Sequence, residues 1–316
     1  MTQRDGLVRF LATELERSVS PGAKALTSRL QEIYGDAVRG VLFYGSCLRR
    51  GDDEGVLDLY VLVDRYRNAY GRGWLSLLNR LLPPNVFYLE TRIGGRSVRA
   101  KYAVVSLDDF ARLNAASTFE PYFWARFAQP CALLYAADAD TATRVSEALA
   151  DAVITLIRRT LPLVPERVEA RELWRRALAE TYRSELRAER AGASAGLLEG
   201  ATERYIRVSQ LALPALPYAA KLELAAGAAW IEARVPARER RAAPHLWRLR
   251  RILGKGLFVL RLLRNGITFD GGLDYLAWKI ERHSGVAVDP SWRERRFRIA
   301  SFGAEVLRLY RRGAFR

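Results

Sequence analysis

Two apolar runs of strand length, separated by a Gly-Ser turn and an acidic loop, constrain the fold of this chain more than any other feature. The first run covers residues 40–44 and the second covers residues 56–63. Gly45 and Ser46 follow the first run directly, and Asp58 lies near the start of the second. Glycine lets the backbone turn sharply so that its amides approach an anion, and the serine hydroxyl adds a donor. The pattern predicts a sheet that presents a phosphate site beside a carboxylate.

Asp58 is the candidate metal ligand of this stretch. Mg²⁺ prefers oxygen ligands, keeps several waters and commonly bridges a carboxylate and nucleotide phosphates. The alternative is a plain turn followed by an ordinary strand-end aspartate, because Gly-Ser dipeptides mark turns in many proteins. The order of strand, Gly-Ser, charged loop and aspartate on a second strand favours the nucleotide site.

These residues resemble the nucleotidyltransferase superfamily that includes DNA polymerase β, whose motif is an apolar strand, Gly-Ser, a spacer and then two acids. Tyr60 occupies the place of the second acid, so the usual carboxylate pair is incomplete. In this respect the chain looks similar to the mitochondrial translocator-assembly-and-maintenance type of phosphatidate cytidylyltransferase and its bacterial relatives. The match covers Tyr44-Gly45-Ser46 and the strand from Asp58 to Asp64.

The resemblance implies a reaction and a set of roles. CTP and phosphatidate would give CDP-diacylglycerol and pyrophosphate, with Mg²⁺ on Asp58 and nucleotide contacts from Tyr44, Gly45 and Ser46. Lys101 and Tyr102 match a Lys-Tyr strand of the family. The resemblance makes Lys101 a phosphate clamp, whereas its position in an apolar strand alone also suits a lysine that blocks edge pairing.

Two further charged residues have two interpretations each. Glu90 is a candidate third carboxylate and metal ligand, or else a solvent-facing strand residue paired with Arg92 or Arg99. Arg126 matches an arginine of the family that precedes a strand, and it would bind a phosphate of either substrate. Its alternative is a salt bridge to a nearby acid such as Glu120.

The resemblance continues in scattered short motifs toward the C-terminus. Tyr182, Glu185 and Arg187 look like a Tyr-x-x-acid-x-Arg segment of the family, and Lys255 lies in a similar Lys-Gly-Leu segment. Helical spacing would put the first three on adjoining turns facing the catalytic domain. A surface ladder of ion pairs is the alternative.

Charge and composition limit the partners. The chain has 51 Lys and Arg against 35 Asp and Glu, a net charge of +16, which indicates a polyanionic partner. An anionic membrane, a phosphorylated substrate or nucleic acid would each satisfy it, and the resemblance favours the membrane. No apolar run reaches the roughly 20 residues of a bilayer span. The two cysteines, Cys47 and Cys131, form no disulfide framework, which is typical of a reducing compartment. We expect a cytoplasmic protein, peripheral on the inner face of a bacterial cell membrane.

The expected fold is α+β and has three parts. Residues 1–138 would form a nucleotidyltransferase domain, a mixed sheet with flanking helices. Residues 139–235, rich in alanine and arginine, would form a helical middle domain. Residues 236–316 would form a basic amphipathic region whose Trp, Phe and Leu side chains face an anionic membrane while its arginines bind the headgroups.

Two other functions fit the same residues. One is a nucleotidyltransferase that acts on RNA or on a small-molecule alcohol, which would need a general base. The other is a catalytically inactive, basic binding module, which Tyr60 favours. A phosphate monoester is already ionised near neutral pH, so a phosphate acceptor would explain one fewer carboxylate.

Overall fold

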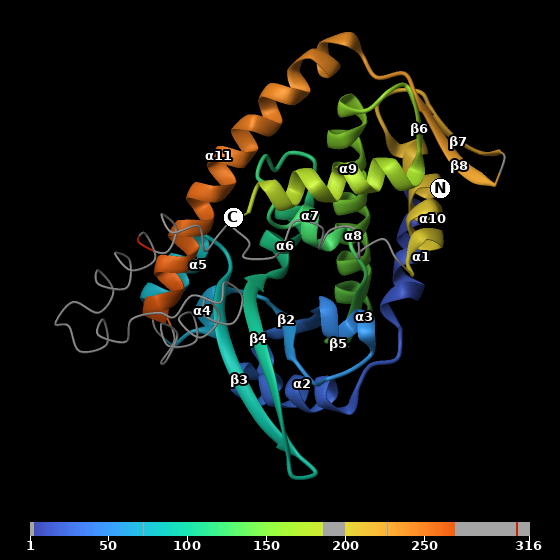
Figure 1. Cartoon of the computed structure of the whole chain (residues 1–316). Helices are drawn as coiled ribbons and strands as arrows, with labels where there is room; N and C mark the ends of the chain where they lie inside the picture. The colour runs from blue at the N-terminus through green and yellow to red at the C-terminus, as the bar shows by residue number, and fades with distance from the viewer. Residues whose placement is uncertain (1–2, 72, 186–199, 226, 269–307, 309–316) are drawn as a thin grey trace.

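The protein is built around a five-stranded mixed sheet (Figure 1). The structure, a computed structural model, describes residues 3–71, 73–185, 200–225, 227–268 and 308. The strand order is β3-β4-β2-β1-β5, and β2 and β4 are the parallel pair. The strands are β1 (Val38–Tyr44), β2 (Val56–Val63), β3 (Asn85–Ile93), β4 (Arg96–Ser106) and β5 (Cys131–Ala136). The predicted α+β class is confirmed.

Helices cover both faces of this sheet. Leu57, Leu59 and Val61 of β2 point toward α2 (Pro21–Tyr34), whose first turn is capped by the Ser20 side chain. Tyr60 and Leu62 point to the other face, as the two-residue period of a strand requires. That face is covered by α1 (Asp5–Leu15), α6 (Leu107–Asn114), α7 (Trp124–Phe127) and α8 (Ala139–Thr160). Three shorter helices lie around the sheet: α3 (Ser46–Arg50), α4 (Tyr66–Ala69) and α5 (Gly73–Leu81).

The segment expected to be purely helical also contains a small sheet, so that expectation was wrong. Besides α9 (Ala170–Arg183) and α10 (Thr202–Ala212) it forms three strands in the order β6-β8-β7. These are β6 (Arg167–Glu169), β7 (Ala220–Ala225) and β8 (Ala228–Ala233). In β8 the alternation of buried Ala229, Ile231 and Ala233 is a strand pattern built largely from alanine, which the composition obscured.

One hydrophobic cluster extends from the large sheet through α8 into this second part. It includes Leu42 and Tyr60 of the sheet, Leu156 of α8, Trp174 of α9 and Ile231 of β8. The core is therefore continuous across residues 138 and 139, where the sequence predicts a domain boundary.

The last described helix, α11 (Ala237–Thr268), runs from the small sheet to the neighbourhood of α5 and lies along one side of the molecule (Figure 1). Its buried side carries Trp247, Arg250, Gly254, Arg261 and Arg264. Its exposed side carries leucine, isoleucine and valine at positions 246, 249, 252, 253, 259, 260 and 263.

This distribution differs from the predicted one. Trp247 does not face outward but packs edge-on against Trp124, with ring centroids 6.0 Å apart. Arg261 is buried because Glu120 binds it through two contacts of 2.6 and 2.8 Å and the Pro83 carbonyl accepts a third hydrogen bond. Among the described residues, no helix combines the length and the apolar character that a membrane span requires.

Candidate active site

Strand register brings three of the predicted residues into one row. Asp58 of β2 lies opposite Tyr44 of β1 on one side and Lys101 of β4 on the other. Directly paired residues point to the same face, so all three side chains leave the sheet together. Lys101 Nζ lies 3.2 Å from Asp58 Oδ1, and each side chain is 28% exposed. The row is thus a half-buried ion pair at the open end of the sheet.

The turn after β1 closes against this ion pair. Gly45 has a φ of +92° and a ψ of −163°, a backbone conformation that residues other than glycine rarely adopt. A Cβ at Gly45 would lie 2.7 Å from Asp58 Oδ2, closer than atoms in contact can approach. Ser46 begins α3 directly after the turn and is exposed. Only glycine therefore lets the chain turn this close to the carboxylate.

Arg126 lies beside the row, almost fully buried, with 11% of its side chain exposed. Its guanidinium is 4.1 Å from the centroid of the Tyr122 ring and 5.8 Å from that of Tyr44, within the range of cation–π attraction. Nη2 lies 3.4 Å from Glu185 Oε1. Burial alone would lower the pKa of Arg126, but the Glu185 carboxylate and the neighbouring tyrosines raise it well above its usual range. Arg126 thus stays a cation.

The predicted alternative for Arg126, a salt bridge to an acid, is confirmed, but the acid is Glu185 and not the suggested Glu120, which binds Arg261. The ion pair between Arg126 and Glu185 joins two residues that belong to separate sequence motifs. Tyr122 lies between Arg126 and Arg261, with each guanidinium 4.1 Å from the ring centroid. The four-residue spacing of Tyr122 and Arg126 in a helical turn was the available signal.

Tyr60 fills the position of the missing second acid. Its side chain is completely buried, and its ring lies 4.9 Å from Phe127 and 5.4 Å from Tyr44. Its hydroxyl has no hydrogen-bond acceptor or donor among the described residues. Burial, and then the nearby Tyr122 hydroxyl, raise the pKa of Tyr60 well above its usual value. Burial and the Asp58 charge likewise raise the pKa of Tyr44. Both phenols are therefore neutral near pH 7.

Glu90 does not join Asp58. It lies on β3, exposed, where Arg99 Nε is 3.3 Å from its carboxylate, so the predicted alternative describes it correctly. Hydrogen bonds from Ser97 and Arg99 lower the pKa of Glu90. In the sheet it is two strands and two residues away from Asp58, about 10 Å or more at ordinary strand spacing. One metal ion cannot contact both.

Asp64 and Tyr102 also lie outside the row. Asp64 is at the opposite end of β2, about 20 Å from Asp58 at the rise of a strand. Its carboxylate accepts hydrogen bonds from the Arg65 amide and the Asn68 side chain, both at 2.5 Å, and so holds the start of α4. Tyr102 points to the other face of the sheet, where its ring stacks on Phe87 at 5.5 Å.

The remaining residues that match the family lie in different parts of the chain. Tyr182 is half-buried at the end of α9 and packs against the core next to Glu185. Lys255 is exposed on α11. Arg187 lies outside the described residues.

The residues present could bind a metal ion only together with a substrate that supplies further ligands. Among the described residues there is no group of three or more His, Cys, Asp or Glu side chains that would hold one. Asp58 offers a single carboxylate beside the Gly45 turn. Mg²⁺ is commonly bound through one or two carboxylates with substrate phosphates and waters completing its shell. Asp58 therefore fits Mg²⁺ that arrives with a nucleotide.

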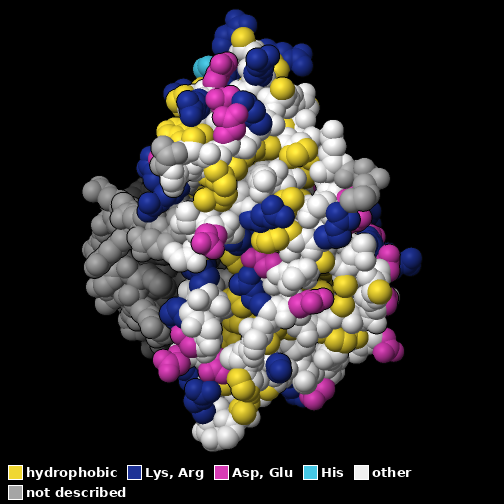
Figure 2. Space-filling model, turned by 90° about the vertical axis from the view of Figure 1, so that its right-hand side faces the viewer, with side chains coloured by type: hydrophobic (Ala, Val, Ile, Leu, Met, Phe, Trp, Pro, Cys, Tyr) yellow, Lys and Arg dark blue, Asp and Glu magenta, His cyan; other side chains and the backbone are white. Residues whose placement is uncertain are grey.

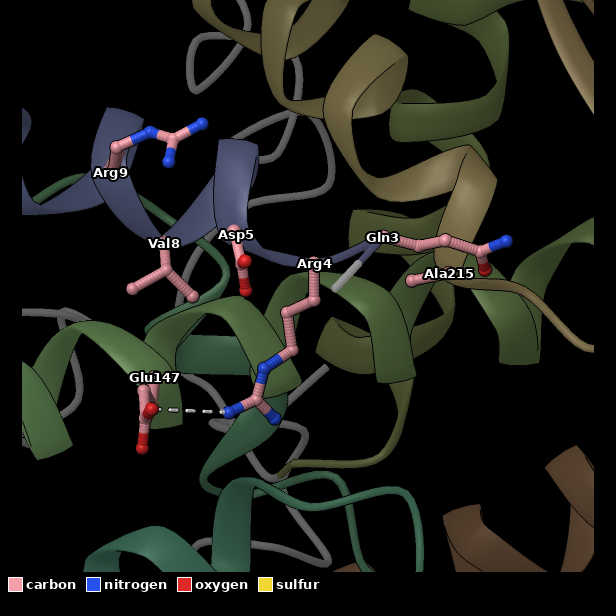
Figure 3. A pocket seen from close by; sticks show the side chains of 7 residues that line it. All are labelled: Gln3, Arg4, Asp5, Val8, Arg9, Glu147 and Ala215. Carbon is pink, nitrogen blue, oxygen red and sulfur yellow. Dashed lines mark ion pairs between the residues drawn. The ribbon is translucent and has the colours of Figure 1, made fainter. Parts of the chain in front are cut away.

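The pocket in Figure 3 lies elsewhere, between the N-terminus and α8, and has a volume of about 650 Å³. Of its two arginines, Arg4 points toward the acids of α8, with ion-pair distances of 3.7 Å to Glu147 and 2.6 Å to Asp151. Because these charges are already paired, we assign the pocket no role in the chemistry.

No protein-family model matches this chain, and no curated protein matches it.

Proposed function

We propose that the chain is a nucleotidyltransferase that moves a nucleotidyl group from a nucleoside triphosphate to a phosphate monoester. CTP and phosphatidate are the pair that the sequence resemblance implies, and CDP-diacylglycerol and pyrophosphate would be the products. The observation that carries the proposal is the Asp58–Lys101 pair, 3.2 Å apart and next to the Gly45 turn, where a Cβ would collide with Asp58. The arrangement of β1, β2 and β4 around it supports a nucleotidyltransferase sheet.

In this reaction an oxygen of the acceptor phosphate forms a bond to the α-phosphorus of the nucleotide. The bond between that phosphorus and the oxygen bridging to the β-phosphorus breaks, and pyrophosphate leaves with the electron pair. Negative charge therefore moves onto the leaving group. The Lys101 ammonium would stabilise this charge where it develops, and the half-buried surroundings strengthen the interaction. Asp58 would hold Mg²⁺, which supplies further neutralisation of the phosphates.

The row of Tyr44, Asp58 and Lys101 contains a single carboxylate, which favours a phosphate acceptor over an alcohol. An alcohol must lose its proton during the attack, whereas a phosphate monoester carries an ionised oxygen at neutral pH. Tyr60 stands where a second carboxylate would be, and its raised pKa keeps its proton in place. Arg126, which Glu185 holds near Tyr44, is already protonated and cannot act as a base. Its positive charge would attract the anionic substrates.

The outer face of α11 supports an acceptor that resides in a membrane. Exposed leucines at positions 249, 253, 260 and 263 and Ile252 lie on the same helix as the exposed Arg241 and Arg248. Such a surface binds an anionic bilayer interface, where each arginine contributes about 1 kcal/mol. On the face of the molecule in Figure 2, by contrast, basic and acidic side chains are interspersed.

The test is nucleotide transfer by the whole chain and one pair of variants. Each of four labelled nucleoside triphosphates is incubated with Mg²⁺ and phosphatidate vesicles, and labelled lipid is counted. We expect lipid product with CTP, a loss of at least 100-fold in Asp58→Asn, and an unchanged rate in Asp140→Asn, an exposed aspartate at the start of α8.

Three outcomes would overturn the proposal. Equal lipid product from the wild type and Asp58→Asn would remove Asp58 from the reaction. Label transferred to an added RNA instead of to lipid would replace the phosphate acceptor with a nucleic acid. Absence of transfer from any of the four nucleotides would favour an inactive binding module.

A further inference from the structure

A second pocket, of about 460 Å³, lies between the C-terminal end of α8 and the first half of α11. Four arginines and a single acid, Glu239, contribute to its walls. The arginines are Arg158, Arg159, Arg238 and Arg250. Pro162, Ala243 and Leu246 add apolar surface. Unlike the pocket at the N-terminus, this one has a large excess of positive charge.

Arg250 is the most deeply buried of the four, with 1% of its surface exposed. Nε donates to the Phe119 carbonyl at 3.1 Å, and the guanidinium lies 4.5 Å from the centroid of the Phe119 ring. Nη2 has no hydrogen-bond partner among the described residues, and Nε of Arg159 has none either. A buried charged donor without an acceptor is costly, since it has lost its hydration and gained nothing in return.

Glu239, the single carboxylate that the described residues contribute to the pocket wall, compensates this charge only in part. In the described part of the chain, none of the four arginines forms an ion pair, whereas the buried Arg126 and Arg261 each have a glutamate partner. Burial and the neighbouring charge of Arg159 lower the pKa of Arg250 to about 10. Burial and the charge of Arg158 lower the pKa of Arg159, and Glu239 offsets only part of this. The site is therefore short of negative charge.

We propose that this arginine pocket binds a phosphate group, carried by a small soluble ester or by a lipid headgroup. Guanidinium groups match phosphate oxygens with paired hydrogen bonds, and a phosphate would supply the acceptors that Arg250 and Arg159 lack. The volume is in the range of small-molecule sites, and the apolar wall suits the carbon part of an ester.

The arginine pocket is separate from the proposed active site. Arg250 lies in the pocket, and Arg261 of the same helix contacts Tyr122 beside Arg126. Eleven helical residues separate them, about 16 Å along the axis. The inference therefore does not depend on the proposed nucleotidyl transfer.

The test compares two double variants with the same change in charge. Arg158→Gln/Arg238→Gln changes the pocket at two arginines that form no hydrogen bond or ion pair with other described residues, so the fold should persist. Arg67→Gln/Arg171→Gln changes two exposed arginines of α4 and α9, outside both the pocket and α11, and is the control. Both are made in a Lys101→Gln background, which weakens phosphate binding at the proposed active site. Far-UV circular dichroism verifies the fold.

Inorganic pyrophosphate, titrated by calorimetry at constant ionic strength, tests the soluble source. Sedimentation with phosphatidylcholine vesicles containing phosphatidate tests the lipid source. We expect the pocket variant to lose at least tenfold in affinity in one of the two arms, which identifies the source, and the control to stay within twofold. Equal loss in the two double variants in both arms, or no binding of either probe by the parent, would overturn the proposal.

Discussion

Gly45 is constrained both by its backbone conformation and by its closeness to a charged side chain. Its φ of +92° and the 2.7 Å that would separate a Cβ from Asp58 Oδ2 are independent constraints, and both require glycine. The first concerns the energy of the turn, while the second concerns the position of the carboxylate. A second glycine in the same region, Gly51, has only the first constraint, because nothing lies within 4 Å of its Cβ position.

This difference makes a pair of substitutions informative. Gly45→Ala should destabilise the fold by about 1–3 kcal/mol through backbone strain and should also displace Asp58 from Lys101. Gly51→Ala should cost about 1–2 kcal/mol through strain alone. Urea unfolding measures both costs, and nucleotide transfer should fall at least tenfold only in Gly45→Ala. Equal activity in the two variants would show that the closeness of Gly45 to Asp58 has no functional weight.

At the residue scale, the resemblance suggested Tyr44, Asp58 and Lys101 as separate members of one site, and only the register of β1, β2 and β4 shows that their side chains form a row. The sequence did not predict that Arg126 binds Glu185, since the two are 59 positions apart and come together only through packing of α7 against α8 and α9. Glu90 failed as a ligand for a similar reason. Its type was suitable, but its distance from Asp58 depends on the order of strands in the sheet.

At the scale of elements, α11 is the part of the molecule in which composition misleads most. Arg250, Arg261 and Arg264 occupy the buried side because Glu120 and the carbonyl groups of residues 82–84 and 119 accept their hydrogen bonds. Hydropathy alone would place the leucines there instead. Gly254 marks the closest approach of α11 to the end of α9, where a Cβ would lie 2.4 Å from the Ser184 carbonyl oxygen.

Two glycines of α11 should therefore respond to alanine with opposite signs. Gly256 is exposed with nothing within 4 Å, so Gly256→Ala should stabilise the protein by about 0.5–1 kcal/mol through helix propensity. Gly254→Ala has the same gain in propensity but must push α11 away from Ser184, and overpacking costs about 1–3 kcal/mol. We expect a lower urea midpoint for Gly254→Ala and a higher one for Gly256→Ala. A rise in both would mean that α11 does not pack closely on α9.

At the scale of the whole molecule, one continuous core joins the large sheet and the small one, which argues against the predicted domain boundary at residue 138. Twelve residues of α8 are buried, and they contact both parts. The sequence favoured separate domains because composition changes after Tyr135. The hydrophobic contacts that join the two parts are long-range, so no local sequence pattern predicts them.

We therefore expect residues 1–138 and 139–235 to unfold together. Tryptophan fluorescence would report on Trp124, which packs with Trp247, and on Trp174, which packs 4.5 Å from Tyr205. Far-UV circular dichroism would report on the helices. The two urea curves should coincide in a single transition, as cooperative unfolding requires. Two separated transitions would restore the predicted boundary.

The inverted sides of α11 also have a consequence for anyone who wishes to engineer the protein. Replacing its outward leucines with glutamine should improve handling in dilute buffer while leaving the architecture alone, because these side chains are among the exposed large hydrophobic residues of the described chain. Exchanging its inward arginines for leucine, which a hydropathy rule would recommend, would instead strand Glu120 and several carbonyl oxygens without donors. Solubility and stability can thus be tuned on this helix separately, one from each side.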